Sequence, residues 1–291
     1  MIRTVQVATG RRITYSDSGP ATGMPVVMCH GLPGSHVQIP NTDVLHTHHV
    51  RMIIIDRPGF GQSDPHPGRS IQSWHDDMLA VLDNEGLAQC VLMPFSAGTP
   101  YALSFTASHP QRVQRLFVVS GMAPNTAADI ARMQWHHRVN HSFGNAMPLW
   151  VTDVVARTAN VVIGKGAHAG RFGMWLMRNV FTPSENVYAH SPAGLVFREM
   201  LAMSFAQGYH SYLEDLRLIT QHWDIDMQRI THPVTCWYGD SDRITPADAG
   251  RQLAMHLPQV QLHVFAGHGH LLIFREWDRL IAQLAHEGTT S

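Results

Sequence analysis

Several features that would mark particular classes of protein are missing from this sequence of 291 residues. No stretch approaches the run of about 18 apolar residues that a membrane-spanning helix needs, and the first ten residues, MIRTVQVATG, contain no apolar signal-peptide core. Lysine is almost absent, with Lys165 alone, and the formal net charge is −1 without any basic or acidic block. These absences argue against a membrane protein and against nucleic-acid binding, and we expect a soluble cytoplasmic protein.

Cysteine is also scarce. Cys29, Cys90 and Cys236 each lie in an apolar, strand-like run, and no pair has the spacing of metal ligands. We therefore expect three buried free thiols in a protein of a reducing compartment.

Histidine, by contrast, is abundant, with 21 residues. Residues 46–49 read HTHH in a loop-like stretch, and His137 and His141 have the i, i+4 spacing that zinc sites use. The second pair lacks a glutamate in the His-Glu-x-x-His arrangement, and no third ligand is implied. Surface or packing histidines are the better interpretation, and we predict no metal and no cofactor.

Short apolar runs alternate with helical patterns along most of the chain. The runs that favour strands are residues 4–8, 12–17, 26–29, 51–55, 90–93, 115–119, 234–238 and 260–265, and the first two form a hairpin around Gly10. Helical patterns cover residues 71–85, 97–108, 246–257 and 276–286. This alternation predicts an α/β fold with a mostly parallel, doubly wound sheet.

The alternation stops between about Pro124 and Ile230, where the sequence is rich in methionine and tryptophan and has no convincing strand. We predict a helical cap at residues 124–230, inserted after the sixth strand, with the core formed by residues 1–123 and 231–291. Such side chains most often pack between helices, but they also suit an apolar pocket.

Ser96 lies between a strand-like run and a helix-like run, in VLMPFSAGTP at residues 91–100. A serine on such a tight turn is lifted clear of the sheet, above a helix N-terminus, where it can act as a nucleophile. Gly98 lets strand and helix pass closely. Pro94 stands where this Gly-x-Ser-x-Gly turn normally has glycine, and proline is tolerable as the last residue of a strand.

Other polar groups follow the apolar runs in the order Ser, Asp, His. The stretch VVMCHGLPGS places Gly31 at the end of an upstream strand, so the backbone N–H groups of Leu32 and Ala97 are candidates to bind a developing oxyanion. Downstream, WYGDSDRITP ends with an acidic loop containing Asp242, and VFAGHGHLL ends with His268 and His270.

Together these motifs resemble the cap-bearing serine hydrolases of the α/β-hydrolase fold superfamily. The matching segments are HGLPGS, DRPGFGQSD at residues 56–64, PFSAGTPYAL, GDSDRITP and GHGH, which span nearly the whole chain, whereas the cap region matches nothing specific. The resemblance implies Ser96 as nucleophile, Asp242 as the acid and His270 as the general base. The chain departs from the family pattern at Pro94, where the family usually has glycine.

The resemblance also orders the competing residues. Its Gly-x-Gly-His pattern favours His270 over His268, and its Gly-Asp-x-Asp spacing favours Asp242 over Asp240, which we interpret as a turn residue bonding its own backbone. His30 is expected to bond backbone and steady the oxyanion loop.

In the stretch DRPGFGQSD, Asp56 and Arg57 are interpreted as a salt-bridged pair that shapes the loop. Catalysis by either side chain is the less favoured reading.

The function expected is hydrolysis of a small, partly apolar carboxylic ester through an acyl-enzyme. An aspartate nucleophile, as in epoxide hydrolases and haloalkane dehalogenases of this fold, is disfavoured by the serine at position 96. Carbon–carbon bond hydrolases and cofactor-free perhydrolases or oxygenases remain alternatives. So does a ligand-binding, receptor-like protein with low turnover, although the intact set of Ser96, Asp242 and His270 argues against it.

Overall fold

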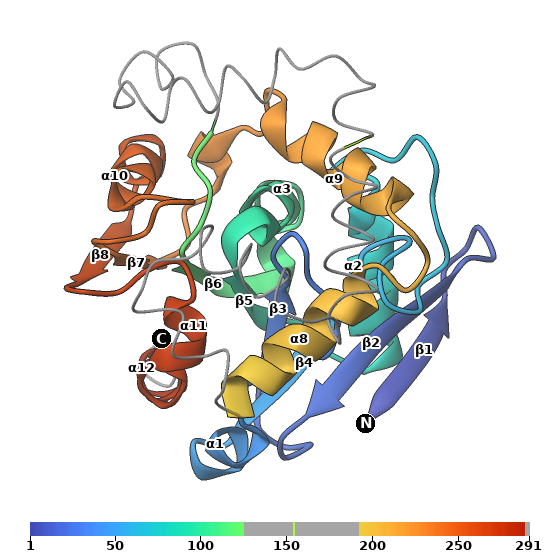
Figure 1. Ribbon diagram of the computed structural model, residues 1–291, viewed down its shortest axis with the longest axis horizontal. Helices are drawn as coiled ribbons and strands as arrows, with labels where there is room; N and C mark the ends of the chain where they lie inside the picture. The colour runs from blue at the N-terminus through green and yellow to red at the C-terminus, as the bar shows by residue number, and fades with distance from the viewer. Residues whose placement is uncertain (125–153, 155–191, 289–291) are drawn as a thin grey trace.

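The computed structural model describes residues 1–124, 154 and 192–288. Its centre is an eight-stranded sheet in the order β1-β2-β4-β3-β5-β6-β7-β8, which runs across the molecule in Figure 1. The strands are β1 (Ile2–Gln6), β2 (Arg12–Ser18), β3 (Met24–Cys29), β4 (Val50–Ile55), β5 (Cys90–Pro94), β6 (Val113–Val119), β7 (Val234–Gly239) and β8 (Val260–Phe265). β1 and β2 pair in antiparallel fashion, as do β2 and β4, and every other neighbouring pair is parallel.

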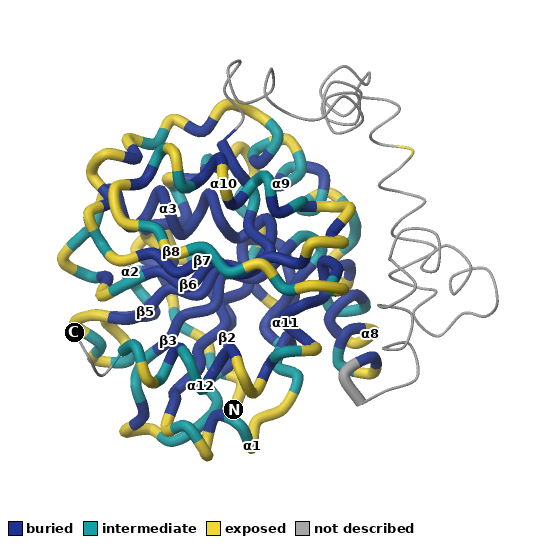
Figure 2. The backbone as a smooth tube through the Cα atoms, turned by 90° about the vertical axis from the view of Figure 1, so that its left-hand side faces the viewer, coloured by how far each residue is buried: buried dark blue, intermediate teal, exposed yellow. Residues whose placement is uncertain are grey.

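Helices cover both faces of the sheet because the strand residues are apolar on both sides. In β3, Val27 and Cys29 belong to the apolar core on the face that α2 (Trp74–Asn84), α3 (Thr99–Ser108) and α10 (Ala247–His256) cover. The alternate residues Val26 and Met28 belong to the apolar core on the other face, which α1 (Thr42–Thr47), α11 (Leu272–Arg275) and α12 (Trp277–Gly288) cover. Figure 2 shows these buried strands running between the helices, so the predicted mostly parallel, doubly wound α/β fold is confirmed.

The predicted strands and helices match the observed ones to within a few residues. Helix α2 begins at Trp74 rather than at residue 71, and residues Ser96–Gly98 form a 3-10 turn before α3 begins at Thr99. The HTHH stretch is not simply a loop, since α1 extends through Thr47. The three cysteines are buried and free, as predicted, and burial raises the pKa values of the Cys29 and Cys236 thiols to about 12.

The chain between β6 and β7 contains α8 (Pro192–Ser204) and α9 (His210–Thr220), which lie within the region predicted as a cap. α8 contributes Phe197, Met200 and Leu201 to the core on the face covered by α12, and α9 contributes Ile219 to the core on the opposite face (Figure 1). Gln207, between them, donates to the carbonyl oxygens of Gly61 and Ser63 in the loop after β4. His137 and His141 lie outside the described residues.

In the part of the chain that the structure describes, no helix is long and apolar enough to cross a membrane.

Candidate active site

Ser96 stands at the carboxyl end of β5, on the turn that leads into α3. Its φ of 51° lies in the left-handed region, which is strained for a residue that has a Cβ atom. The turn is also tight. A Cβ atom on Gly98 would lie 2.0 Å from the carbonyl oxygen of Cys29, so only glycine lets the start of the helix pass this close to β3. The sequence places a strained serine at the point where strand and helix meet.

Pro94 leaves one gap in the hydrogen-bonded ladder between β5 and β6. The N–H of the next residue, Phe95, donates to the Cys29 carbonyl of β3, so the nitrogen of Pro94 faces β6. The paired register of β5 and β6 ends at Leu92 and Leu116, and only an isolated bridge from Phe95 to Val119 follows. That bridge continues the register of Leu92 and Leu116, so the two strands stay paired past Pro94, and what proline costs is the hydrogen bond that its missing N–H would donate.

His270 joins Ser96 and Asp242 in one hydrogen-bonded chain. Its Nδ1 lies 2.9 Å from Asp242 Oδ2, and its Nε2 lies 3.0 Å from Ser96 Oγ. Because Nδ1 faces a carboxylate, that nitrogen carries the proton, and Nε2 is left to accept the hydrogen bond from the serine hydroxyl. The structure thus brings together three residues that are up to 174 positions apart in the sequence.

Asp242 is itself held in a fixed orientation. Its Oδ1 accepts hydrogen bonds from the backbone N–H groups of Ile244 and Thr245, at 2.8 and 2.9 Å. Its side chain is fully buried, and its Oδ2 is the oxygen that faces His270. A carboxylate held this way keeps the imidazole in one orientation and one tautomer.

Thr245 is a residue at this site that the sequence reasoning missed. Its Oγ1 donates to the carbonyl oxygen of Ser120 at 2.8 Å, and it lies 3.0 Å from both Asp242 Oδ2 and His270 Nδ1. The hydroxyl therefore connects the acidic loop, the histidine and the end of β6. The sequence signal that could have identified Thr245 was its position directly before Pro246 in the acidic loop. That signal is weak, because a threonine three residues after an aspartate is also common in ordinary turns.

The candidate oxyanion loop follows β3 and lies beside Ser96. A Cβ atom on Gly31 would lie 2.9 Å from a ring carbon of Phe95 and 3.5 Å from Cβ of Ser96, so any side chain here would have to displace the Phe95 ring. In the described part of the chain, the backbone N–H groups of Leu32 and Ala97 donate to no other group. These are the two donors that the sequence analysis nominated, and they are available to a ligand.

His30 is buried beneath this loop and bonds backbone atoms, as expected. Its Nε2 accepts from the N–H of Arg57 at 3.2 Å, so Nδ1 carries the proton and donates to the carbonyl oxygen of Gly31 at 2.8 Å. Burial, followed by the positive charge of Arg57, holds the pKa of His30 well below its usual value. The ring is neutral at physiological pH and serves as a fixed donor to the loop.

The two competing residues have other partners. His268 pairs with Glu276 at 2.8 Å through Nε2, and its Nδ1 lies 2.8 Å from the carbonyl oxygen of Ala266. The interpretation of Asp240 as a residue bonding its own backbone is wrong, because its carboxylate accepts the N–H of Gly267 at 2.8 Å. Asp240 therefore ties the acidic loop to the histidine loop, a contact between segments that sequence spacing does not reveal.

The expected salt bridge between Asp56 and Arg57 is also wrong. Asp56 pairs with His36 at 2.6 Å, and Arg57 pairs with Asp215 of α9 at 2.7 Å. Adjacent residues in an extended segment point to opposite sides, so neighbours in the sequence there seldom reach each other.

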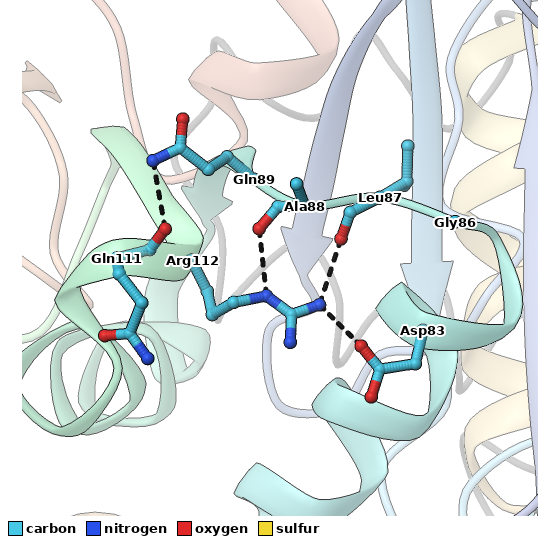
Figure 3. Close-up of a pocket in the computed structure, with 7 residues that line it drawn as sticks. All are labelled: Asp83, Gly86, Leu87, Ala88, Gln89, Gln111 and Arg112. Atoms are coloured by element: carbon cyan, nitrogen blue, oxygen red, sulfur yellow. Dashed lines mark hydrogen bonds and ion pairs between the residues drawn. The ribbon is translucent and has the colours of Figure 1, made fainter.

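A surface pocket of about 650 Å³ lies far from this chemistry, at the amino ends of β5 and β6. In Figure 3 the guanidinium of Arg112 crosses it and donates to Asp83 and to the carbonyl oxygens of Leu87 and Ala88. Parallel sheets bind ligands at the carboxyl ends of their strands, which is where Ser96 lies. Among the described residues, no group of three or more His, Cys, Asp or Glu side chains is placed to hold a metal ion.

Comparisons with known proteins agree with this architecture. The AB hydrolase superfamily protein YisY of Bacillus subtilis is 25% identical to the chain, over 96% of this chain and 98% of its own length. The 2-hydroxymuconate semialdehyde hydrolase of Pseudomonas putida is also 25% identical, over 91% of this chain and 86% of its own. The solved structure of an esterase from Thermogutta terrifontis superposes with a TM-score of 0.70 at 18% identity, over 100% of this chain and 98% of that one.

A family model for the alpha/beta hydrolase fold matches residues 24–276, which include Ser96, Asp242 and His270. The matched segment is most of the chain, and it contains the strands from β3 to β8. The chain belongs to the alpha/beta hydrolase fold family.

Proposed function

We propose that this protein is a serine hydrolase that cleaves carboxylic esters through an acyl-enzyme. The observation that carries the proposal is the continuous chain from Ser96 Oγ to His270 Nε2, at 3.0 Å, and from His270 Nδ1 to Asp242 Oδ2, at 2.9 Å. A hydroxyl, an imidazole and a carboxylate at these distances form a nucleophile, its base and the group that orients the base.

The reaction follows from where the protons lie. As Ser96 Oγ bonds to the carbonyl carbon of the ester, its proton moves to His270 Nε2, and the developing imidazolium is stabilised by Asp242. The same proton then passes to the leaving alkoxide, which departs as the alcohol. A water molecule, activated in turn by His270, releases the acid and restores Ser96, so the cycle uses only side chains of the chain and water.

The negative charge on the carbonyl oxygen needs two fixed donors, and we assign these to the N–H groups of Leu32 and Ala97. Gly31 supports the first because its missing side chain lets the loop lie beside Ser96. Gly98 supports the second because it lets the 3-10 turn of Ser96–Gly98, which leads into α3, pass close to β3. An oxyanion hole of this type contributes about 10² to 10³ in kcat per donor.

The substrate proposed is a small ester with an apolar portion, held between this site and a cap formed by residues 124–230. The composition of that region supports the apolar preference, since adaptable methionine and large tryptophan side chains suit a pocket for hydrocarbon groups.

A series of p-nitrophenyl esters from acetate to longer acyl chains tests the proposal. We expect the rate of hydrolysis to rise from the acetate to the butyrate ester. Ser96→Ala should lower kcat by about 10⁴-fold or more, while its unfolding midpoint changes no more than that of a surface variant. The matched control is Ser108→Ala, at an exposed position in α3. An active Ser96→Ala enzyme would contradict the proposal, and a folded wild type that binds esters without turnover would favour the receptor-like alternative.

A second candidate is hydrolysis of a carbon–carbon bond. The observation in its favour is the likeness to the 2-hydroxymuconate semialdehyde hydrolase of Pseudomonas putida over 91% of this chain. The same serine and histidine can act on a ketone carbonyl with carbon as the leaving group. Measuring kcat/KM for 2-hydroxymuconate semialdehyde beside the ester series decides between the two, and the substrate with the larger value identifies the activity.

A further inference from the structure

A buried ion cluster joins helix α9 to the core beneath the oxyanion loop. Asp215 accepts hydrogen bonds from Arg57 Nε at 2.7 Å, from Arg69 Nη2 at 2.6 Å and from the Tyr101 hydroxyl at 2.8 Å. The side chains of Arg57 and Arg69 are 1% exposed and that of Asp215 is fully buried. Burying such charges is costly, and apolar residues of similar size would often serve stability as well, so the cluster calls for a further explanation.

The remaining donors of Arg57 supply that explanation. Nη1 donates to the carbonyl oxygen of His30, and Nη2 donates to that of Gly31 at 2.9 Å. All three nitrogens of the planar guanidinium are therefore engaged, one with the carboxylate and two with consecutive carbonyl groups of the oxyanion loop. Asp215 fixes one side of the rigid fork, and the other side fixes the loop.

The carbonyl of Gly31 belongs to the same peptide group as the N–H of Leu32. This peptide bond is trans and planar, so its C=O and N–H point in opposite directions. A donor that holds the Gly31 oxygen on the buried side therefore turns the Leu32 N–H toward the opposite side. Charge-assisted bonding to the oxygen also polarises the amide and makes its N–H a stronger donor.

Two donors converge on this one oxygen, since His30 Nδ1 also reaches it, at 2.8 Å. The charge of Asp215, the partner of Arg57, is also defined. Burial raises the pKa of its carboxyl group, but Arg57 and Arg69 lower it further, so that the pKa lies below its ordinary value. The carboxylate is thus ionised at neutral pH, and the guanidinium keeps a fixed partner.

We propose that Arg57, held by Asp215 of α9, is a positioning residue that orients and strengthens the Leu32 N–H of the oxyanion hole. The proposal rests on the proposed function, because it assigns how one of the two oxyanion donors is set. It also makes α9 more than a covering element, since this helix supplies the carboxylate on which the geometry depends.

The test compares Arg57→Lys with a matched control, Arg112→Lys. Arg112 likewise donates to a carboxylate and two consecutive carbonyl groups, but at the opposite edge of the sheet (Figure 3). Lysine keeps the charge and loses the fork. We expect Arg57→Lys to lower kcat for p-nitrophenyl butyrate by about 10- to 100-fold with KM within about twofold, and Arg112→Lys to change neither.

A tetrahedral inhibitor provides the readout that a merely structural role would not move. Butaneboronic acid forms an anionic adduct with the serine, so its affinity should fall by the same factor as kcat/KM in Arg57→Lys. An unchanged inhibition constant, or a loss of activity that only follows the loss of folded protein, would overturn the inference. Asp215→Asn, which keeps the shape of the side chain, should give a smaller loss of about tenfold and decides the matter if Arg57→Lys does not fold.

The failures of the two proposals are distinguishable. A wild type that hydrolyses no ester and is not labelled by a serine-reactive phosphonate overturns the proposed function, and this inference falls with it. An active, labelled wild type whose Arg57→Lys and Asp215→Asn variants keep full kcat overturns this inference alone.

Discussion

The backbone at Ser96 should store strain that can be measured as stability. With φ of 51°, the residue occupies the left-handed region, which costs a residue with a Cβ atom about 1–2 kcal/mol. Glycine relieves that strain, but its greater conformational entropy in the unfolded chain destabilises the folded state by about 0.5–1 kcal/mol. Ser96→Gly should therefore be more stable than Ser96→Ala by about 0.5–1 kcal/mol, although both variants lack the nucleophile.

A second pair of variants separates the strain from the ordinary cost of glycine. Ser108 is the exposed last residue of α3 and has no positive φ, so Ser108→Gly should be less stable than Ser108→Ala, by at most about 0.5–1 kcal/mol because a helix end tolerates glycine better than an interior position. The difference between the two pairs then gives the strain at Ser96 directly. Urea unfolding at neutral pH, analysed with a common slope, provides the four free energies. If glycine is as unfavourable at position 96 as at position 108, the strained-turn account of this serine is refuted.

Three further predictions concern the histidines and the acidic loop. His270→Ala should lower kcat by about 10⁴-fold while His268→Ala costs far less, and a reversed order in ester kinetics would show that the wrong loop histidine was assigned. Thr245→Val should lower kcat about tenfold through loss of a contact of about 1–2 kcal/mol, with Thr245→Ser restoring it; equal losses in both variants would contradict a role for the hydroxyl. Burial, and then the positive charge of a protonated His109, lower the pKa of His75 to about 4. Between about pH 4 and 6.5 the unfolded chain therefore binds more protons than the folded one. The free energy of unfolding falls as the pH is lowered through this window. Between pH 8 and pH 5 the free energy of unfolding of the wild type should drop by about 2 kcal/mol more than that of His75→Phe, and parallel pH profiles would refute this assignment.

The fold was largely predictable because its local signals agree with one another. Buried parallel strands produce apolar runs such as residues 26–29 and 51–55, and glycine or proline marks the turns between them. Ser96, Asp242 and His270 were predictable for a related reason. Each follows a strand of a parallel sheet, and the carboxyl ends of such strands meet at one edge.

Contacts between distant segments were not predictable in the same way. The partner of Arg57 is 158 residues away, on a helix whose sequence shows only amphipathic periodicity. Asp240 likewise bonds a loop 27 residues further on. Nothing in local spacing distinguishes such a carboxylate from one that bonds its own turn, so the pairing rests on tertiary geometry alone.

The most direct test of the account is covalent labelling of the serine. The enzyme is treated with diethyl p-nitrophenyl phosphate, and peptide mass spectrometry locates the phosphoryl group. The account predicts one group per chain, on Ser96, formed at least about 10³-fold more slowly in His270→Ala because the base that takes the hydroxyl proton is gone. Rapid ester turnover by a wild-type protein that is unlabelled at Ser96, or equal labelling rates in the two proteins, would contradict it.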